Sequence, residues 1–174
     1  MHLEGTVLVG PDFEPVEGRV VVADGEIIRI EEAAVDADDV ILPAFVNAHT
    51  HVGDSIAKEA GEGLSLDELV APPDGLKHRL LRATDRKEKV AAMARTLRHM
   101  ESTGTGTFLE FREGGVEGVR ALRDALAGEG VPFGERAIES VVFGRDDSDV
   151  LSVADGYGAS GARDADFDAV RAAA

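Results

Sequence analysis

The sequence contains no cysteine, which excludes a disulfide scaffold, a thiolate zinc site and a cysteine nucleophile. It also lacks tryptophan, and aromatic residues make up only 5% of its 174 residues. Long apolar runs are missing as well. The run 40–46 spans seven residues and contains Pro43, whereas a membrane helix needs about 20 residues. With no basic leader at the start either, we expect a cytoplasmic protein that has no membrane partner.

Basic residues are few, and lysine is scarcer than arginine, with four lysines against fourteen arginines. Acidic side chains outnumber basic ones by 34 to 18, which gives a formal net charge of −16. Phosphate backbones repel such a chain, so we exclude nucleic acid as a partner. Dispersed carboxylates with little lysine are typical of proteins from salt-loving organisms, because concentrated salt screens their repulsion. We predict a halophilic protein, with an ordinary acidic protein as the alternative.

The beginning of the chain is typical of a small β structure. Three short β-branched runs predict strands: residues 6–9, 19–22 and 27–30. Asp24 and Gly25 separate the last two runs and predict a hairpin turn in which both residues take positive φ. The acidic stretch 31–39 predicts a connection, and the apolar run 40–46 predicts a further strand.

The rest of the chain has a different pattern. Residues 54–84 are rich in glycine and proline and predict a long irregular loop. Asp85 is a candidate N-cap for the helix that follows it, and Gly104 a candidate terminator. Strand and helix patterns then alternate: a strand at 105–111, a helix at 115–126, a strand at 131–143 and a helix at 164–174. This alternation predicts an α/β fold with parallel strands and crossover helices.

Two histidines follow the apolar run directly, in the segment Asn47-Ala48-His49-Thr50-His51. Alternate side chains of an extended chain point the same way, so His49 and His51 share a face at the end of a buried strand. Two imidazoles in this arrangement can ligate one divalent metal ion, zinc by preference, with iron or manganese as alternatives. Two histidines in a surface loop are the alternative interpretation.

The segment from Ile41 to Asp54, ILPAFVNAHTHVGD, resembles the first barrel strand of the amidohydrolase superfamily, which includes cytosine deaminases and imidazolonepropionases. The hairpin before it is similar to the small β-sandwich that these enzymes carry. The resemblance implies a β-sandwich segment over residues 1–40 and the first half of a (β/α)₈ TIM-like barrel over 41–174. Ala44 stands where the family usually has glycine, and we expect a local backbone adjustment there.

The resemblance implies a metal-dependent hydrolase that acts on non-peptide C–N bonds, in a cyclic amide or by deamination, through a metal-activated water. His49 and His51 correspond to metal ligands. The family's later ligands and its proton-transferring carboxylate have no counterpart here. Since a full barrel needs about 250 residues, we expect a truncated or split form. Three explanations remain open: an inactive remnant, a chain that pairs with a complementary C-terminal half, or a chain that self-associates.

Further candidate residues lie near the predicted site. Glu110, Arg112 and Glu113 lie at the C-terminal end of the second barrel strand, the end that faces the active site in barrels. Arg112 is a candidate for binding a substrate carboxylate, and Glu110 for orienting a ligand histidine; an internal ion pair is the alternative. Asp54 is placed either near the metal or in a loop cap. The sequence identifies no catalytic acid or base.

Two other classes of function remain as alternatives. Residues 156–161 match the G-x-G-x-x-G pattern of a dinucleotide-binding module. However, no clear strand precedes the pattern, and the acidic residue expected about 20 residues later would fall beyond residue 174. A non-catalytic fragment or binding protein that lacks a complete metal site is the other alternative.

Overall fold

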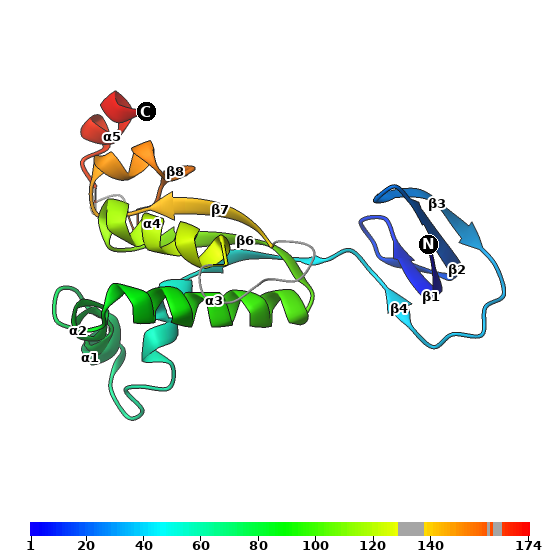
Figure 1. The fold of residues 1–174 in the computed structure, drawn as a ribbon, viewed down its shortest axis with the longest axis horizontal. Helices are drawn as coiled ribbons and strands as arrows, with labels where there is room; N and C mark the ends of the chain where they lie inside the picture. Colours follow the sequence, from blue (N-terminus) through cyan, green and yellow to red (C-terminus); the bar gives the residue numbers. More distant parts are fainter. Residues whose placement is uncertain (129–137, 160, 162–164) are drawn as a thin grey trace. The chain divides into compact units, whose positions relative to one another are not determined.

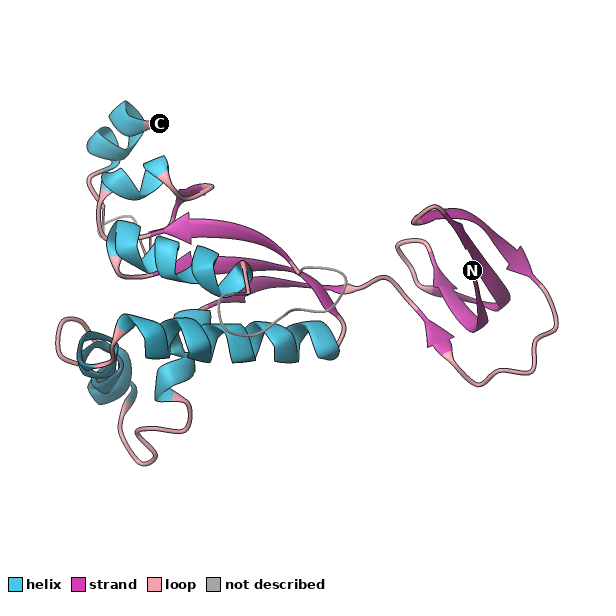
Figure 2. Cartoon of the chain, in the orientation of Figure 1, coloured by secondary structure: helices cyan, strands magenta, loops and turns pink. Residues whose placement is uncertain are grey.

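The computed structural model describes residues 1–128, 138–159, 161 and 165–174. The chain forms two compact units, Met1–Ala44 and Phe45–Ala174 (Figure 1). The described residues of the first unit form strands and loops, whereas the second unit combines strands with helices (Figure 2). No helix in the described part of the chain combines the length and the apolar character that crossing a membrane requires.

The first unit is a single four-stranded sheet in the order β3-β2-β1-β4. Its strands are β1 (His2–Val9), β2 (Glu14–Ala23), β3 (Glu26–Glu32) and β4 (Val40–Ile41). Asp24 and Gly25 connect β2 to β3 with φ angles of 53° and 82°, which confirms the predicted hairpin turn. The described residues of this unit show one sheet, so the second layer of a sandwich stays a prediction.

The apolar run 40–46 forms two strands, not the single strand predicted from its composition. β4 ends at Ile41, and β5 (Phe45–Thr50) begins after Pro43 and belongs to the other sheet. Proline has no N–H for a strand ladder, so the run divides at this residue. The expectation of a buried strand is also wrong, because residues 45–49 are exposed and β5 lies at the edge of its sheet.

The second unit contains a parallel sheet whose strands follow chain order. Its members are β5, β6 (Thr105–Arg112), β7 (Glu139–Gly144) and β8 (Gly156–Tyr157). The helices α3 (Arg86–Ser102) and α4 (Gly115–Leu126) lie alongside β6 and β7 (Figure 1). Phe108 and Val142 of the sheet pack in one core with both helices. The predicted alternation of parallel strands and crossover helices is confirmed for these elements.

Local signals explain where α3 begins and ends. Asp85 caps it, accepting a hydrogen bond from the Glu88 backbone N–H at 2.8 Å, as predicted. Met93 and Leu97 recur at helical spacing and are fully buried, which stabilises the packing by about 1.5–3 kcal/mol for each side chain. Gly104 follows the helix with a φ of 92°, the left-handed conformation that favours glycine.

The long irregular loop predicted for residues 54–84 is partly helical. It contains most of the 3₁₀ helix η1 (Val52–Ala57), together with α1 (Leu66–Val70) and α2 (Leu76–Ala83). A capping box formed by Ser65 and Glu68 begins α1, and its Ser-x-x-Glu signal was present in the sequence. The glycines and prolines occupy the connections between these short helices, and their frequency concealed the helices.

The structure describes the C-terminal region only in part. Residues 131–137 of the strand expected at 131–143 lie outside the described residues. The rest of the expected strand is β7, which begins at Glu139. The segment before the glycine-rich pattern, where the sequence predicted no clear strand, contains the 3₁₀ helix η2 (Ser148–Ser152), and the last helix is α5 (Phe167–Ala173). Gly156 lies within β8, whereas the glycines of a dinucleotide-binding loop follow their strand.

Gly118, in the first half of α4, packs directly against the backbone that leads out of β6. A Cβ atom at this position would lie 2.0 Å from the Glu113 carbonyl oxygen. We therefore expect Gly118→Ala to lower the free energy of unfolding by about 1–3 kcal/mol in urea denaturation, because the backbone must shift. Arg120→Ala, an exposed change on the same helix, should alter it by less than about 0.5 kcal/mol. A Gly118→Ala protein of wild-type stability would contradict this expectation.

Candidate functional site

The strand β6 separates two faces with different surroundings. Phe108, Glu110 and Arg112 alternate along one face and are buried. Phe108 packs with α3 and α4, so this is the helix face of the sheet. Phe111 points the other way and stacks on His49, with ring centroids 4.7 Å apart. We call this second surface the histidine face.

His49 and His51 lie together at the C-terminal end of β5. Their Nε2 atoms are 3.3 Å apart. Two nitrogen ligands bound to a tetrahedral zinc ion at about 2.0–2.1 Å lie about 3.3 Å from each other. The two imidazoles therefore have the separation that adjacent positions around one metal ion require.

The other ring nitrogen of His51 is also engaged. Its Nδ1 lies 3.0 Å from the Phe111 carbonyl oxygen, to which an Nδ1–H group donates. This hydrogen bond leaves the Nε2 lone pair available to a metal, as is usual for histidine ligands. A Glu113 carboxylate oxygen lies 3.5 Å from the same Nδ1. The interaction with Glu113 raises the pKa of His51 and outweighs the opposing effect of burial.

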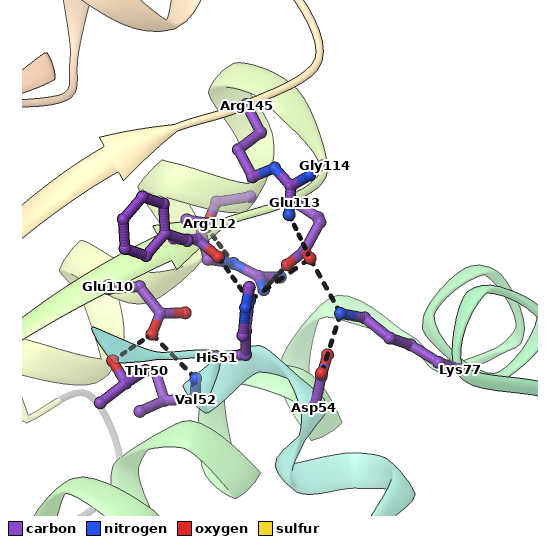
Figure 3. A network of polar contacts seen from close by, with 12 residues as sticks. Thr50, His51, Val52, Asp54, Lys77, Glu110, Arg112, Glu113, Gly114 and Arg145 are labelled. Atoms are coloured by element: carbon purple, nitrogen blue, oxygen red, sulfur yellow. Dashed lines mark hydrogen bonds and ion pairs between the residues drawn. The ribbon is translucent and has the colours of Figure 1, made fainter. Parts of the chain in front are cut away.

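Glu113 is the centre of a charged cluster at the end of β6 (Figure 3). Its Oε1 atom accepts hydrogen bonds from Lys77 Nζ at 2.8 Å and from Arg145 at 3.1 Å. Lys77 also donates to Asp54 at 2.9 Å. Burial by itself raises the pKa of Glu113, but the hydrogen bonds from His51 and Lys77 outweigh it and hold this pKa well below its ordinary value. Glu113 is therefore an anion at neutral pH.

Glu110 lies on the helix face, immediately behind the histidine strand. Its Oε2 atom lies 2.6 Å from Thr50 Oγ1 and accepts a hydrogen bond from the Val52 N–H at 2.9 Å. The side chain is fully buried. Burial raises the pKa of Glu110 to about 7, although the contacts with Thr50 and Val52 act in the opposite direction. Glu110 thus contacts the residues on both sides of His51 but not its imidazole.

The structure places the remaining predicted residues as follows. Asp54 lies in η1 and forms an ion pair with Lys77. Arg112 is 3% exposed, and its Nε donates to the Gly118 carbonyl of α4 at 3.2 Å. Its guanidinium occupies the space beside Gly53, where a Cβ would lie 1.6 Å from it. Arg112 therefore lies between the sheet and α4, and its predicted role toward a substrate stays a prediction.

Lys77 and Arg145 are the residues that sequence reasoning did not include. They come from α2 and from the segment after β7, far from the histidines in sequence, so no local pattern relates them to the site. Two other histidines, His78 and His99, belong to helices. His99 lies in the last turn of α3, and His78 Nε2 lies 3.1 Å from the Val70 carbonyl oxygen.

The histidine pair offers two nitrogen atoms at the separation of two ligands of one metal ion. Among the residues that the structure describes, no group of three or more His, Asp or Glu side chains is placed to hold a metal ion. Zinc sites normally have at least three protein ligands. The described residues therefore offer two of the ligands that such a site needs, and a complete site would need at least one more.

A profile of the amidohydrolase family matches residues 40–159, and the chain belongs to this family. The chain is 40% identical over 149 residues to a protein of Methanothermobacter thermautotrophicus named "Putative aminohydrolase", covering 82% of this chain and 37% of that protein. It is 32% identical over 174 residues to an uncharacterized protein of Methanocaldococcus jannaschii, covering 93% of this chain and 44% of the other. The chain thus spans about two fifths of the length of these relatives. The family resemblance inferred from ILPAFVNAHTHVGD is confirmed.

Solved structures with a similar chain path include two enzymes. A guanine deaminase from C. acetobutylicum with bound guanine has a TM-score of 0.49 and 14% identity, covering 83% of this chain and 35% of its own. The A. niger ochratoxinase has a TM-score of 0.49 and 16% identity, covering 99% of this chain and 43% of its own.

Proposed function

We propose that this chain forms part of a metal-dependent hydrolase that cleaves a non-peptide C–N bond, in a cyclic amide or by deamination. The observation that supports this most is the 3.3 Å separation between the Nε2 atoms of His49 and His51. The pair lies at the C-terminal end of a parallel strand, where (β/α) barrels carry their active sites. Membership of the amidohydrolase family agrees with this class of reaction.

His49 and His51 would hold the metal ion, zinc by preference, with iron or manganese as alternatives. The chemistry that such an ion supplies when bound is the activation of water as a nucleophile near neutral pH. The chain's own contribution is to orient both imidazoles. The Phe111 ring packs on His49, and the Phe111 carbonyl accepts the Nδ1–H of His51, so one residue of β6 restrains both ligands.

We further propose that additional strands and helices complete the sheet and supply the remaining ligands. The edge strand β5 leaves Phe45 and Val46 56% and 63% exposed, and such an apolar edge is normally covered in a folded protein. The covering segment would be a longer form of this chain, a complementary polypeptide or a second copy. The greater length of the relatives supports such an arrangement.

Zinc titration tests the metal proposal. We expect calorimetry to show one zinc ion bound per chain, and the His49→Ala/His51→Ala variant to lose affinity by about 100-fold or more, because it loses both ligands. The matched control, His2→Ala/His99→Ala, also removes two histidines and should bind as the wild type does. Equal zinc binding by both double variants would overturn the proposal.

A non-catalytic binding protein is the second candidate, and the observation that favours it is the lack of a third ligand among the described residues. Light scattering in concentrated salt, combined with an assay of ammonia release from amino-heterocycles, separates the two. A folded monomer that binds zinc but hydrolyses nothing would favour the binding protein. A defined assembly with zinc-dependent hydrolysis would favour the enzyme.

A further inference from the structure

The backbone that carries the histidines is irregular. Asn47 pairs with Phe108 of β6, but the next aligned pair is Thr50 with Glu110, so β5 has one residue more than β6 over this interval. The interval with the extra residue comprises Ala48 and His49. A bulge of this kind interrupts the regular ladder and changes the direction of nearby side chains. Backbone pairing alone therefore leaves this stretch less restrained than a regular strand.

A side chain of β6 restrains the strand at this point. One oxygen of Glu110 contacts the Thr50 hydroxyl at 2.6 Å and the Val52 N–H at 2.9 Å. These two residues flank His51. Glu110 is fully buried and Thr50 is 8% exposed, so water competes little for these contacts. The Glu110 carboxyl group holds the backbone on both sides of His51.

The hydroxyl of Thr50 makes this contact part of a series of hydrogen bonds. Its Oγ1 also lies 2.9 Å from the Leu109 carbonyl oxygen. A threonine hydroxyl has one proton, so when it donates to Leu109, a protonated Glu110 must donate to Thr50. When Glu110 is ionised, the hydroxyl donates to it instead. The contact between Glu110 and Thr50 is present in both cases.

We propose that Glu110 is a positioning residue for His51, and that it aims the Nε2 atom of this histidine at the point where it meets the Nε2 of His49. Glu110 acts from the helix face through Thr50 and Val52, without touching the imidazole. This inference rests on the proposed metal-binding function. It adds that the orientation of the His51 imidazole depends on a carboxyl group on the opposite face of the sheet.

Zinc affinity and histidine NMR of the 174-residue chain test the inference. Glu110→Met fills the space but removes both contacts, and we expect it to weaken zinc binding by about 10–100-fold, as is usual when an outer partner of a ligand is lost. Glu110→Gln keeps an oxygen that can accept from both groups and should stay within about threefold of the wild type. Thr107→Val is the matched control, since it removes a 3.5 Å contact between Thr107 and Glu139 on the other edge of β6.

The NMR readout needs no metal. In the zinc-free wild type at slightly alkaline pH, ¹⁵N imidazole spectra should show the Nδ1–H tautomer of His51, because Nδ1 donates to Phe111. Glu110→Met should show a mixture of tautomers. If this variant does not fold, Thr50→Val, which removes only the hydroxyl, is expected to give the same change.

Folded Glu110→Met or Thr50→Val with wild-type zinc affinity and an unchanged tautomer would overturn the inference. A wild-type chain that binds no zinc would overturn the proposed metal function instead. The tautomer signal would then decide the positioning role by itself: a mixture in the variants supports it, and no change refutes it.

Discussion

Replacing Glu113 by glutamine is expected to lower the free energy of unfolding of the C-terminal unit by about 2–4 kcal/mol at neutral pH. Glu113 is the shared anion of three cationic side chains, those of Lys77, Arg112 and Arg145. The amide cannot neutralise them. The Glu113 side chain is only 12% exposed, so water compensates little for the lost charge. Removing one partner of a largely buried ion pair typically lowers the free energy of unfolding by an amount of this order.

Urea unfolding of wild type and Glu113→Gln measures the effect, with Glu117→Gln as the control. Glu117 carries the same negative charge as Glu113, but its side chain is exposed and pairs with Arg120 at 2.7 Å. An exposed pair of this kind contributes at most about 1 kcal/mol. If Glu113→Gln changes stability no more than Glu117→Gln does, the cluster has no structural importance.

The pH dependence of this effect has a definite sign. The pKa of Glu113 is lower in the folded protein than the ordinary value of 4.5. Its stabilising contribution is therefore present above pH 4.5 and is lost as the pH falls below it, because protonation removes the charge. The difference between wild type and Glu113→Gln should accordingly shrink in acid. A difference that persists unchanged into strong acid would contradict the assignment of Glu113 as the anion.

Glu110 is expected to have the opposite dependence on pH. Burial raises its pKa from 4.5 to about 7, so the folded protein binds this proton more tightly than the unfolded chain does. Its contribution is fully present below pH 4.5 and is lost as the pH rises toward about 7. The two pKa values correspond to about 3 kcal/mol of stability lost over this interval.

The difference in unfolding free energy between wild type and Glu110→Gln isolates this effect, because glutamine does not titrate. Wild-type stability should fall relative to the variant as the pH rises from about 5 to 7. His51, whose pKa is also raised, loses its contribution as the pH rises above 6.5, and it does so in both proteins. Glu139→Gln, an exposed change on β7, serves as the control. A difference that is constant across this pH range would show that Glu110 does not titrate there.

Much of the secondary structure was predictable because its signals are local. The Asp24-Gly25 turn, the Asp85 cap and the helical period of α3 each involve residues a few positions apart. The proximity of the two histidines was predictable for the same reason, since His49 and His51 are separated by one residue. Pro43 was a further local signal, but its effect on strand pairing depends on which sheet each half joins.

The charged cluster was not predictable from any segment by itself. Lys77, Glu113 and Arg145 lie in three separate parts of the chain, and their contacts form only when α2, β6 and the end of β7 pack together. Arg112 illustrates the same limit. Its position at the end of β6 was evident, but whether it faces the histidines or the helices depends on which face of the sheet is covered.

The sequence by itself therefore determined the elements with local signals, the histidine pair and the family to which the chain belongs. The tertiary structure decided that Glu110 contacts Thr50 and Val52 from the helix face and that Glu113 pairs with the cations near His51. The physical reason is the separation along the sequence over which each interaction acts. Capping, turn geometry and strand alternation act over a few residues, whereas burial and charge pairing depend on segments that meet only in the folded chain.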